Sequence, residues 1–217
     1  MLDLMNTPGI VLRAEPVNEY DRRVVILTGN SGKITAFANG ARRQGNRLQA
    51  CTDLFVFADF KLFAGRNSYT LNDATVKNYF PELRDDFTGA LYGMYFLELA
   101  DYCTRENNDE RDMLTLLYQS LRALVHPDFD NRLVKMVFEL KSIMIMGEFD
   151  RERYRVGCSQ SAGYTMDFLL ATHPKSLYHF KLKDEVLTEM IRIAAAECTR
   201  VFEGHRFKSA EMLDVLK

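Results

Sequence analysis

The spacing of apolar residues changes once along this chain, at Pro81, and that change constrains the fold more than any other feature. Before Pro81, short runs alternate apolar and polar residues and are separated by Gly, Asn and Ser, which is the pattern of half-buried strands. After it, apolar residues recur every three to four positions, as in amphipathic helices. Pro81 also suits the first position of a helix. The sequence therefore predicts an α+β protein with a strand domain over residues 1–80 and an all-α domain over 81–217.

The N-terminal part is expected to contain five short strands, and five strands at this spacing predict an OB-fold β-barrel. In the fourth strand one set of alternate side chains is apolar throughout and is the expected barrel core. The other set mixes aromatic and charged residues, so it could stack bases or pack against the helical domain, and we favour packing because that domain follows directly. The expected strands are 9–13, 23–28, 33–39, 54–63 and 69–77; the core set is Leu54, Val56, Ala58, Phe60 and Leu62, and the mixed set is Phe55, Phe57, Asp59, Lys61 and Phe63.

The helical part predicts a first helix from Pro81, a second that stops before His126-Pro127, and a third capped by Asp128 or Asp130 and ending at Gly147. Residues 148–160 predict a loop or short strand, followed by helices over 162–172 and 184–203 and a short last helix that Ser209 caps and that ends at Leu216. The expected buried stripes are Leu83, Phe87, Leu91, Met94 and Leu97; Met113, Leu117, Leu121 and Leu124; and Leu133, Met136, Val137, Leu140, Ile143 and Met144.

Composition excludes several classes of protein. With 47% apolar residues in 217 the chain can bury a core and is not intrinsically disordered. No basic leader or apolar stretch of membrane-spanning length is present, so we expect a cytoplasmic protein. The four cysteines contain no C-x-x-C pair, which favours reduced thiols over disulfides. No Walker A loop, Ser/His/Asp motif or H-E-x-x-H motif occurs, so we expect no enzyme activity and no cofactor.

The net charge of −2 conceals a gradient along the chain. Residues 1–80 hold 10 basic and 7 acidic side chains, whereas residues 81–217 hold 18 and 23. Between residues 21 and 50 six basic side chains face one acid, Asp21. The glycine turn Gly40-Ala41-Arg42-Arg43, with Arg47 shortly after it, presents guanidinium groups that can hold phosphates in bidentate fashion. This region predicts a nucleic-acid contact, although charge alone fits a solvated loop equally well.

The order of these features resembles the RecO family of bacterial DNA repair and recombination-mediator proteins. The resemblance covers most of the chain, is specific at the N-terminus and weakens toward the C-terminus. The segments that carry it are Gly9-Ile10-Val11-Leu12-Arg13, Glu19-Tyr20-Asp21, Leu27-Thr28, Gly32-Lys33-Ile34, Gly40-Ala41-Arg42-Arg43, Arg47-Leu48, Tyr79-Phe80-Pro81-Glu82-Leu83-Arg84, Phe138-Glu139-Leu140-Lys141, Met146-Gly147 and Phe207-Lys208-Ser209.

The chain departs from that family in one place. Many relatives carry a zinc module of two C-x-x-C pairs just after the segment that corresponds to Gly147-Glu148-Phe149, whereas this chain has only Cys158 there. We therefore expect that the module is deleted near residues 150–160 and that no metal is bound. A substitute site from Cys158, His173 and His179 has spacings that seldom make a closed tetrahedral site.

The resemblance implies a non-enzymatic mediator of the RecFOR pathway of DNA recombination and DNA damage repair. Such a protein binds single- and double-stranded DNA, anneals complementary strands and helps load RecA onto DNA coated by single-stranded DNA-binding protein. Its implied partners are RecR, in some cases RecF, and the acidic C-terminal tail of single-stranded DNA-binding protein. Two other classes stay open. One is a scaffold that bridges single-stranded DNA-binding protein and RecR without touching DNA. The other is a nucleic-acid enzyme, which no carboxylate spacing supports.

Motif matching assigns the contacts as follows. DNA phosphates are expected at Lys33, Arg42, Arg43 and Arg47, with Arg13, Arg22 and Arg23 as second choices; Arg22 and Arg23 could instead be ordinary strand-entry residues. The acidic tail needs an apolar groove with a basic rim. The candidate groove has Arg132, Lys135 and Lys141 as rim and Phe138 or Leu140 as floor, the alternative being an ordinary helix core with solvated basic residues.

Overall fold

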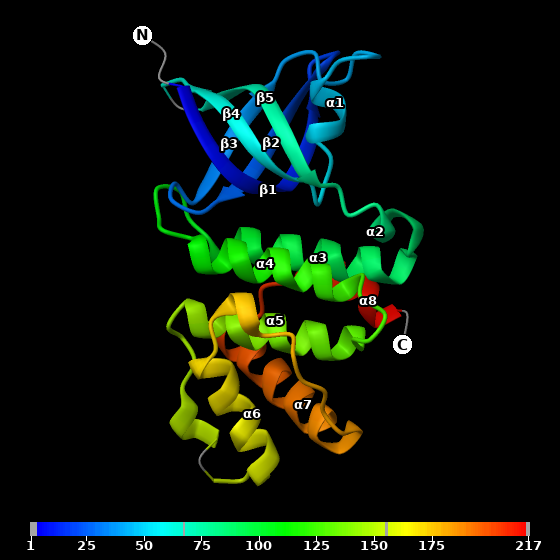
Figure 1. The fold of residues 1–217 in the computed structure, drawn as a ribbon. Coiled ribbons are helices and arrows are strands. Elements are labelled where there is room, and N and C mark those ends of the chain that lie inside the picture. The colour runs from blue at the N-terminus through cyan, green and yellow to red at the C-terminus, as the bar shows by residue number, and fades with distance from the viewer. Residues whose placement is uncertain (1–3, 67, 155, 216–217) are drawn as a thin grey trace. The chain divides into compact units, whose positions relative to one another are not determined.

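Five strands close into one barrel at the N-terminal end of the chain (Figure 1). The computed structural model describes residues 4–66, 68–154 and 156–215. Around the barrel the strand order is β1-β2-β3-β5-β4, and β4 pairs again with β1; only β3 and β5 run parallel. The predicted α+β class with an OB-fold barrel is confirmed. The strands are β1 (Leu4–Val17), β2 (Asp21–Thr28), β3 (Lys33–Ala38), β4 (Phe57–Ala64) and β5 (Tyr69–Asn78).

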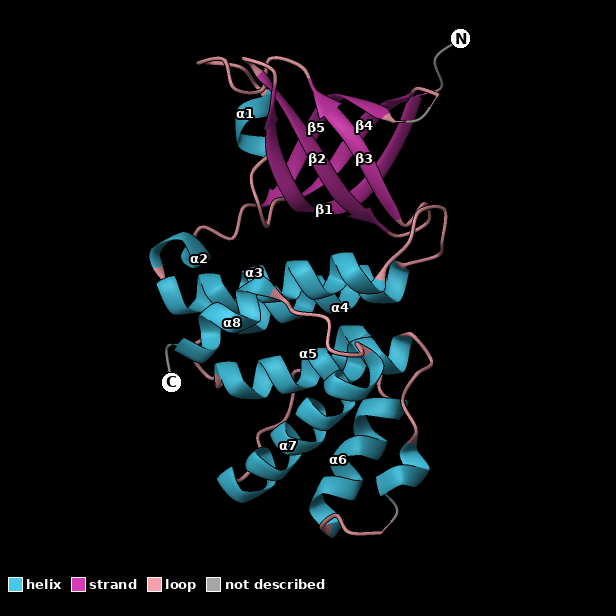
Figure 2. Ribbon diagram, turned by 180° about the vertical axis from the view of Figure 1, so that it is seen from behind, coloured by secondary structure: helices cyan, strands magenta, loops and turns pink. Residues whose placement is uncertain are grey.

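Alternating side chains fill the barrel, as the period of two predicts. Val56, Ala58, Phe60 and Leu62 are all fully buried and belong to one apolar cluster. Leu54, predicted in the same set, lies outside β4, because Phe55 takes a positive φ of 70° and turns the chain just before the strand begins. A short helix, α1 (Leu48–Cys51), lies beside the barrel in Figure 2 and was not predicted, since four residues are too few to show a helical period.

The mixed face of β4 is partly covered by β5. Lys77 on β5 pairs with Asp59 at 2.8 Å and lies 5.9 Å from the centre of the Phe57 ring. Phe55 is buried, and Lys61 is exposed. The cation beside the Phe57 ring is thus already paired with a carboxylate, which makes it less available to a phosphate next to a stacked base.

The chain forms two compact units. One consists of the chain up to Arg84 together with Leu97–Leu114, and the other of Asp85–Phe96 together with Thr115–Lys217. We call them the barrel unit and the helical unit. The helices are α2 (Glu82–Asp85), α3 (Phe87–Cys103), α4 (Arg111–Leu124), α5 (Asn131–Ile145), α6 (Gln160–Ala171), α7 (Asp184–Val201) and α8 (Lys208–Val215). None in the described part of the chain is long and apolar enough to cross a bilayer.

The expected first helix is interrupted, and part of its predicted stripe is wrong. Asp86 separates α2 from α3, and Phe87 opens α3 with 69% of its surface exposed. Along α3 the buried residues are not confined to a stripe, because Tyr95, Phe96 and Leu97 are all buried in succession. A single helical face could therefore not be read from this segment.

The next two helices follow their predicted stripes closely. The stripe of α4 is buried, as is that of α5 except for Met144, which is half-buried. Asp130 caps α5 by accepting a hydrogen bond from the backbone N of Arg132, which settles the choice left between Asp128 and Asp130. Ser209, in contrast, is buried inside α8 and is not its cap; the predicted end of that helix, Leu216, lies outside the described residues.

The core of the helical unit contains a buried acid held by two partners. Phe96 stacks on Phe138 with 4.3 Å between ring centres. Beside them the Tyr95 hydroxyl donates to Glu139 at 2.7 Å, and Lys135 pairs with the same carboxylate at 2.6 Å. α5, α6 and α7 pack against one another around this core.

Candidate nucleic-acid interface

The tip of the β1–β2 hairpin and the loop after β3 are joined by hydrogen bonds. The backbone N of Arg42 donates to the carbonyl of Tyr20 at 2.8 Å, and the backbone N of Gly40 donates to the Asp21 carboxylate at 2.7 Å. The Arg42 guanidinium reaches the carbonyl of Glu19 at 3.2 Å. We call residues 39–47 the arginine loop. These bonds hold the arginine loop on the hairpin tip.

Backbone conformation explains why the chain can turn at these places. Asn18 takes a φ of 52° at the hairpin tip, and Gly40 takes a φ of 68° where the arginine loop begins. Asparagine tolerates the left-handed region and glycine occupies it without a Cβ clash. A Cβ on Gly40 would also approach the Asn46 side-chain nitrogen to 3.0 Å. The glycine of the Gly40-Ala41-Arg42-Arg43 motif is therefore required by the turn.

Asp21 couples the two segments electrostatically. The hydrogen bond from the Gly40 backbone N lowers the pKa of Asp21, as do the Asn18 side chain and the charge of Arg43. The carboxylate is thus fully ionised near neutral pH. It anchors the glycine and leaves one negative charge beside the arginines.

Arg42 and Arg43 are exposed, and neither makes a salt bridge to any residue that the structure describes. Among the described residues, Arg42 donates to the backbone carbonyls of Asn18 and Glu19. The Arg43 guanidinium lies over the Tyr20 ring, 4.8 Å from its centre. Since no carboxylate of the described structure lies within salt-bridge distance of them, both guanidinium groups can bind an anion without first breaking an ion pair.

Arg47, at the far end of the arginine loop, is similarly accessible. Its side chain is 66% exposed and donates to the carbonyl of Asn72 at 2.9 Å, while the nearest carboxylate, that of Asp73, lies 3.9 Å away. An exposed pair at that distance contributes little energy. The three arginines predicted on this loop are therefore all exposed, and Arg43 among them contacts Tyr20.

The other four predicted contacts face carboxylates at close range. Lys33 and Arg13 share Asp101, at 2.9 Å and 3.2 Å. Lys33 is only 21% exposed and also donates to the Asp101 carbonyl at 2.6 Å. Arg22 pairs with Asp53 at 2.7 Å, and Arg23 with Glu15 at 2.6 Å. These four cations are thus paired within the barrel unit, whereas Arg42 and Arg43 make no salt bridge to a described residue.

Sequence reasoning missed Tyr20 as part of this surface. The residue was noted only as part of a family motif, because it lies more than 20 positions before Arg43 and nothing in linear spacing places the two side chains together. The signal that the sequence offered was the place of Tyr20 in Glu19-Tyr20-Asp21, one of the segments that carry the family resemblance.

The five residues of the predicted peptide groove do not form one surface on α5. Phe138 and Leu140 are fully buried. Lys141 is also buried and donates to the carbonyls of Leu169 and Thr172, both at 2.7 Å, so it closes the C-terminal end of α6. Buried in this way, Lys141 links α5 to α6 and cannot form part of the exposed rim of the predicted groove.

The remaining two candidates on α5 are more accessible but paired. Arg132 is exposed and makes hydrogen bonds to Asp130, with Asp184 3.7 Å away. Lys135 pairs with the buried Glu139 and lies 5.3 Å from the centre of the Tyr95 ring. Neither cation stands beside an apolar floor formed by the predicted residues.

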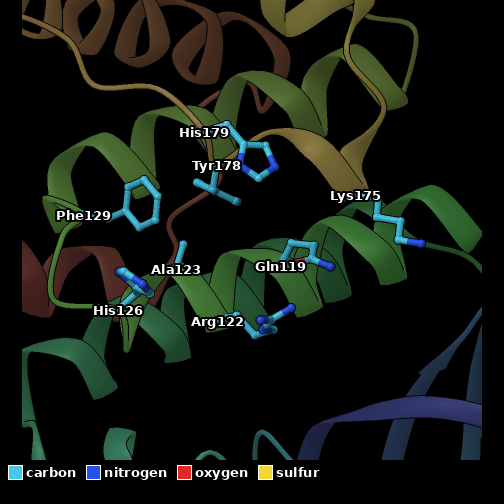
Figure 3. A pocket seen from close by; sticks show the side chains of 8 residues that line it. All are labelled: Gln119, Arg122, Ala123, His126, Phe129, Lys175, Tyr178 and His179. Carbon is cyan, nitrogen blue, oxygen red and sulfur yellow. The ribbon is translucent and has the colours of Figure 1, made fainter.

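A pocket of about 410 Å³ opens elsewhere in the helical unit (Figure 3). Its lining combines two aromatic rings with two permanent cations and two histidines, and contains no carboxylate. Phe129 and Tyr178 meet edge to face at 5.9 Å, and the buried Tyr178 hydroxyl shares a hydrogen bond with Ser120 at 2.6 Å. The lining residues are Gln119, Arg122, Ala123, His126, Phe129, Lys175, Tyr178 and His179.

The short segment after α5 is tied to α7 by side chains. The Tyr154 hydroxyl donates to the buried carboxylate of Glu197 at 2.8 Å, and Arg200 pairs with the same carboxylate. Burial first, and then this hydrogen bond, raise the pKa of Tyr154 to about 12. Residues 148–150 and 156–159 are irregular, as the predicted loop requires, and a short helical turn at Arg151–Tyr154 interrupts them; Arg155 lies outside the described residues.

The described part of the chain contains no group of three His, Cys, Asp or Glu side chains placed to hold a metal ion. Cys158 donates instead to the carbonyl of Tyr154 at 2.9 Å. Two other thiols are poorly reactive, because burial raises the pKa of Cys51 to about 11 and that of Cys103 to about 12. That the protein binds no zinc stays a prediction.

The geometry defines an OB-fold protein with a C-terminal helical region, and loops of OB-folds are a common place for oligonucleotides to bind. Family comparison makes the assignment specific. The model described as "Recombination protein O N terminal" matches residues 1–80, and "Recombination protein O C terminal" matches residues 84–149. The chain belongs to the RecO family of DNA repair proteins.

Individual relatives agree with this assignment. The DNA repair protein RecO of Alkaliphilus metalliredigens is 32% identical over 191 residues, which is 85% of this chain and 78% of the relative. That of Symbiobacterium thermophilum is 36% identical over 159 residues, 73% and 63% of the two chains. The RecO of Acetivibrio thermocellus is 24% identical over 248 aligned positions, more than the 217 residues of this chain, so it has segments that this chain lacks.

Proposed function

We propose that this protein binds single- and double-stranded DNA through the arginine loop and anneals complementary strands as a DNA repair mediator. The observation that carries the proposal is the exposure of Arg42 and Arg43 without a carboxylate partner in the described structure, on a loop held in place by the hairpin tip. Guanidinium groups bind phosphates bidentately. Neutralising phosphates lets two strands approach each other, which is the physical requirement of annealing.

The wider role follows from family membership. We propose that the protein acts in the cytoplasm, without a cofactor and without catalysis, and helps load RecA onto DNA coated by single-stranded DNA-binding protein. RecR, the acidic tail of single-stranded DNA-binding protein and in some conditions RecF are its proposed partners. The absence of a Walker A loop or a hydrolase motif from the sequence supports a binding role.

A salt series tests DNA binding directly. Binding of a fluorescent single-stranded oligonucleotide is measured from low to moderate salt for the wild type and for Arg42→Ala/Arg43→Ala, and annealing is scored in the same samples. We expect a steep loss of wild-type affinity with salt, and a loss of about tenfold or more in affinity, together with annealing, in the double variant.

The matched control is Arg192→Ala/Arg206→Ala, which removes two exposed arginines from the helical unit and changes the net charge equally. Its affinity should stay within about twofold of wild type, because loss of net charge alone has a small screened effect. Equal losses in both double variants would show that DNA responds to overall charge and that the arginine loop is not the site.

A second candidate function is a scaffold that holds acidic protein tails and does not contact DNA. The pocket of the helical unit favours it, because aromatic walls beside Arg122 and Lys175 suit a peptide that ends in an apolar side chain and a carboxylate (Figure 3). We therefore place the proposed site for the tail of single-stranded DNA-binding protein in this pocket and not on the α5 face.

A synthetic acidic peptide ending in phenylalanine distinguishes the candidates. The pocket proposal predicts micromolar binding that Arg122→Ala/Lys175→Ala weakens about tenfold and Arg192→Ala/Arg206→Ala leaves unchanged. Peptide binding by a wild-type protein that fails to bind DNA at low salt would support the scaffold. Peptide affinity that is equal in both double variants would exclude the pocket.

A further inference from the structure

Tyr20 is the exposed aromatic residue that stands among the accessible arginines of the barrel unit. Its side chain is 40% exposed at the hairpin tip, and its backbone carbonyl accepts the bond from Arg42 that joins hairpin and loop. The Arg43 guanidinium lies over the ring at 4.8 Å. The ring is therefore fixed in position by contacts on its backbone and over its face.

An aromatic ring held in this way suits stacking of a nucleobase. Base-on-aromatic stacking is tolerant of sequence because every base has a π-face. Arginine adds a cation–π contact to the ring and carries charge to an adjacent phosphate. A cation also lies near the Phe57 ring on β4, but that cation, Lys77, is paired with Asp59 at 2.8 Å, whereas Arg43 makes no salt bridge to any described residue.

Single and double strands offer this surface different chemistry. Both present phosphates to Arg42 and Arg43, but in a duplex the base faces are covered by neighbouring bases, whereas a single strand can turn a base outward. We propose that Tyr20 stacks an unpaired base and so makes the arginine loop prefer single-stranded over double-stranded DNA. The inference rests on the proposed DNA binding and adds to it the strand preference and the residue responsible.

The test uses Tyr20→Leu in the full-length protein, with affinities measured for a single strand and for a duplex of equal phosphate number. We expect a loss of about tenfold for the single strand and less than twofold for the duplex. Unchanged duplex affinity would show that Arg43 still binds phosphates after it has lost its contact with the ring. Tyr20→Phe, which keeps the ring, should retain single-strand affinity.

Tyr79 provides a matched control, since it belongs to the same unit and is 42% exposed. Tyr79→Leu should change neither affinity. With an iodouracil-substituted single strand, photocrosslinking should label Tyr20 and not Tyr79.

Equal losses for single strand and duplex in Tyr20→Leu, or no loss for either, would overturn the stacking role while leaving DNA binding intact. A wild type that binds neither DNA overturns the proposed function and this inference together.

Discussion

The arginine loop and the strands of the same barrel carry similar cations in different surroundings. On the loop, Arg42 donates to carbonyls and Arg43 covers a ring, and neither makes a salt bridge to a described carboxylate. On the strands, every predicted DNA contact faces an acid at 2.6 to 3.2 Å: Lys33, Arg13, Arg22 and Arg23. The difference teaches that a count of basic residues overstates a binding site, because pairing decides which of them can meet a phosphate.

Among the predictions, replacement of Asp101, which pairs with two strand cations, should have the largest effect on stability. Replacing it by Ala leaves Lys33 and Arg13 without their shared carboxylate in a partly buried place. We expect the free energy of unfolding to fall by about 3 kcal/mol, measured by urea denaturation. Asp73→Ala, which removes the acid 3.9 Å from Arg47, should cost less than about 0.5 kcal/mol. A loss of unfolding free energy in Asp101→Ala as small as that in Asp73→Ala would mean that the ion pairs on the strands do not stabilise the barrel unit.

Gly40→Ala should change the arginine loop with a smaller cost in stability. At a φ of 68° an alanine is strained by about 1 kcal/mol, and the loop shifts relative to the hairpin tip. We expect affinity for a single-stranded oligonucleotide to fall about fivefold. Gly204→Ala has similar strain at a φ of 78° in the helical unit and should leave DNA affinity unchanged. An unaltered affinity in Gly40→Ala would contradict a role for loop geometry.

Asp21→Asn should produce the smallest change, and in the opposite direction. The amide can still accept the bond from the Gly40 backbone N, while the negative charge beside Arg43 is lost. We expect DNA affinity to rise about twofold, measured with the same fluorescent single-stranded oligonucleotide. An unchanged or reduced affinity would show that Asp21 does not oppose phosphate binding.

The pH dependence of Asp21 has a definite sign. Its pKa is lowered in the folded protein, so its contribution to stability is fully present above its unfolded value near 3.8 and is lost as pH falls through the lower folded pKa. Between pH 5 and 8 the wild type should therefore show no change in stability from this group. Urea denaturation of wild type and Asp21→Asn across that range should give a constant difference.

Local pattern predicted much of the fold. Val56, Ala58, Phe60 and Leu62 are buried as their alternation requires, and Asp130 caps α5 as its position suggests. In both cases a few neighbouring residues determine the outcome. The failure at α3 has the same origin, because a helix buried on several sides has no stripe to detect.

The candidate site depends on contacts between distant parts of the sequence. Lys33 contacts Asp101, which lies 68 positions further along the sequence, and Arg43 contacts Tyr20, which lies 23 positions before it. Such pairs determine whether a cation is free, and no local pattern records them. Sequence reasoning therefore listed seven cations together, of which the fold pairs four with carboxylates at 2.6 to 3.2 Å; that the arginine loop contacts DNA stays a prediction.

One measurement tests the separation of loop and strand cations most directly. The salt dependence of single-strand binding is compared for Arg42→Ala/Arg43→Ala and Arg13→Ala/Arg23→Ala, which remove the same charge from the same barrel. We predict that the loop variant flattens the slope of log affinity against log salt by about 1.4 and the strand variant by less than about 0.3. Equal flattening in the two variants would contradict the assignment of DNA binding to the arginine loop.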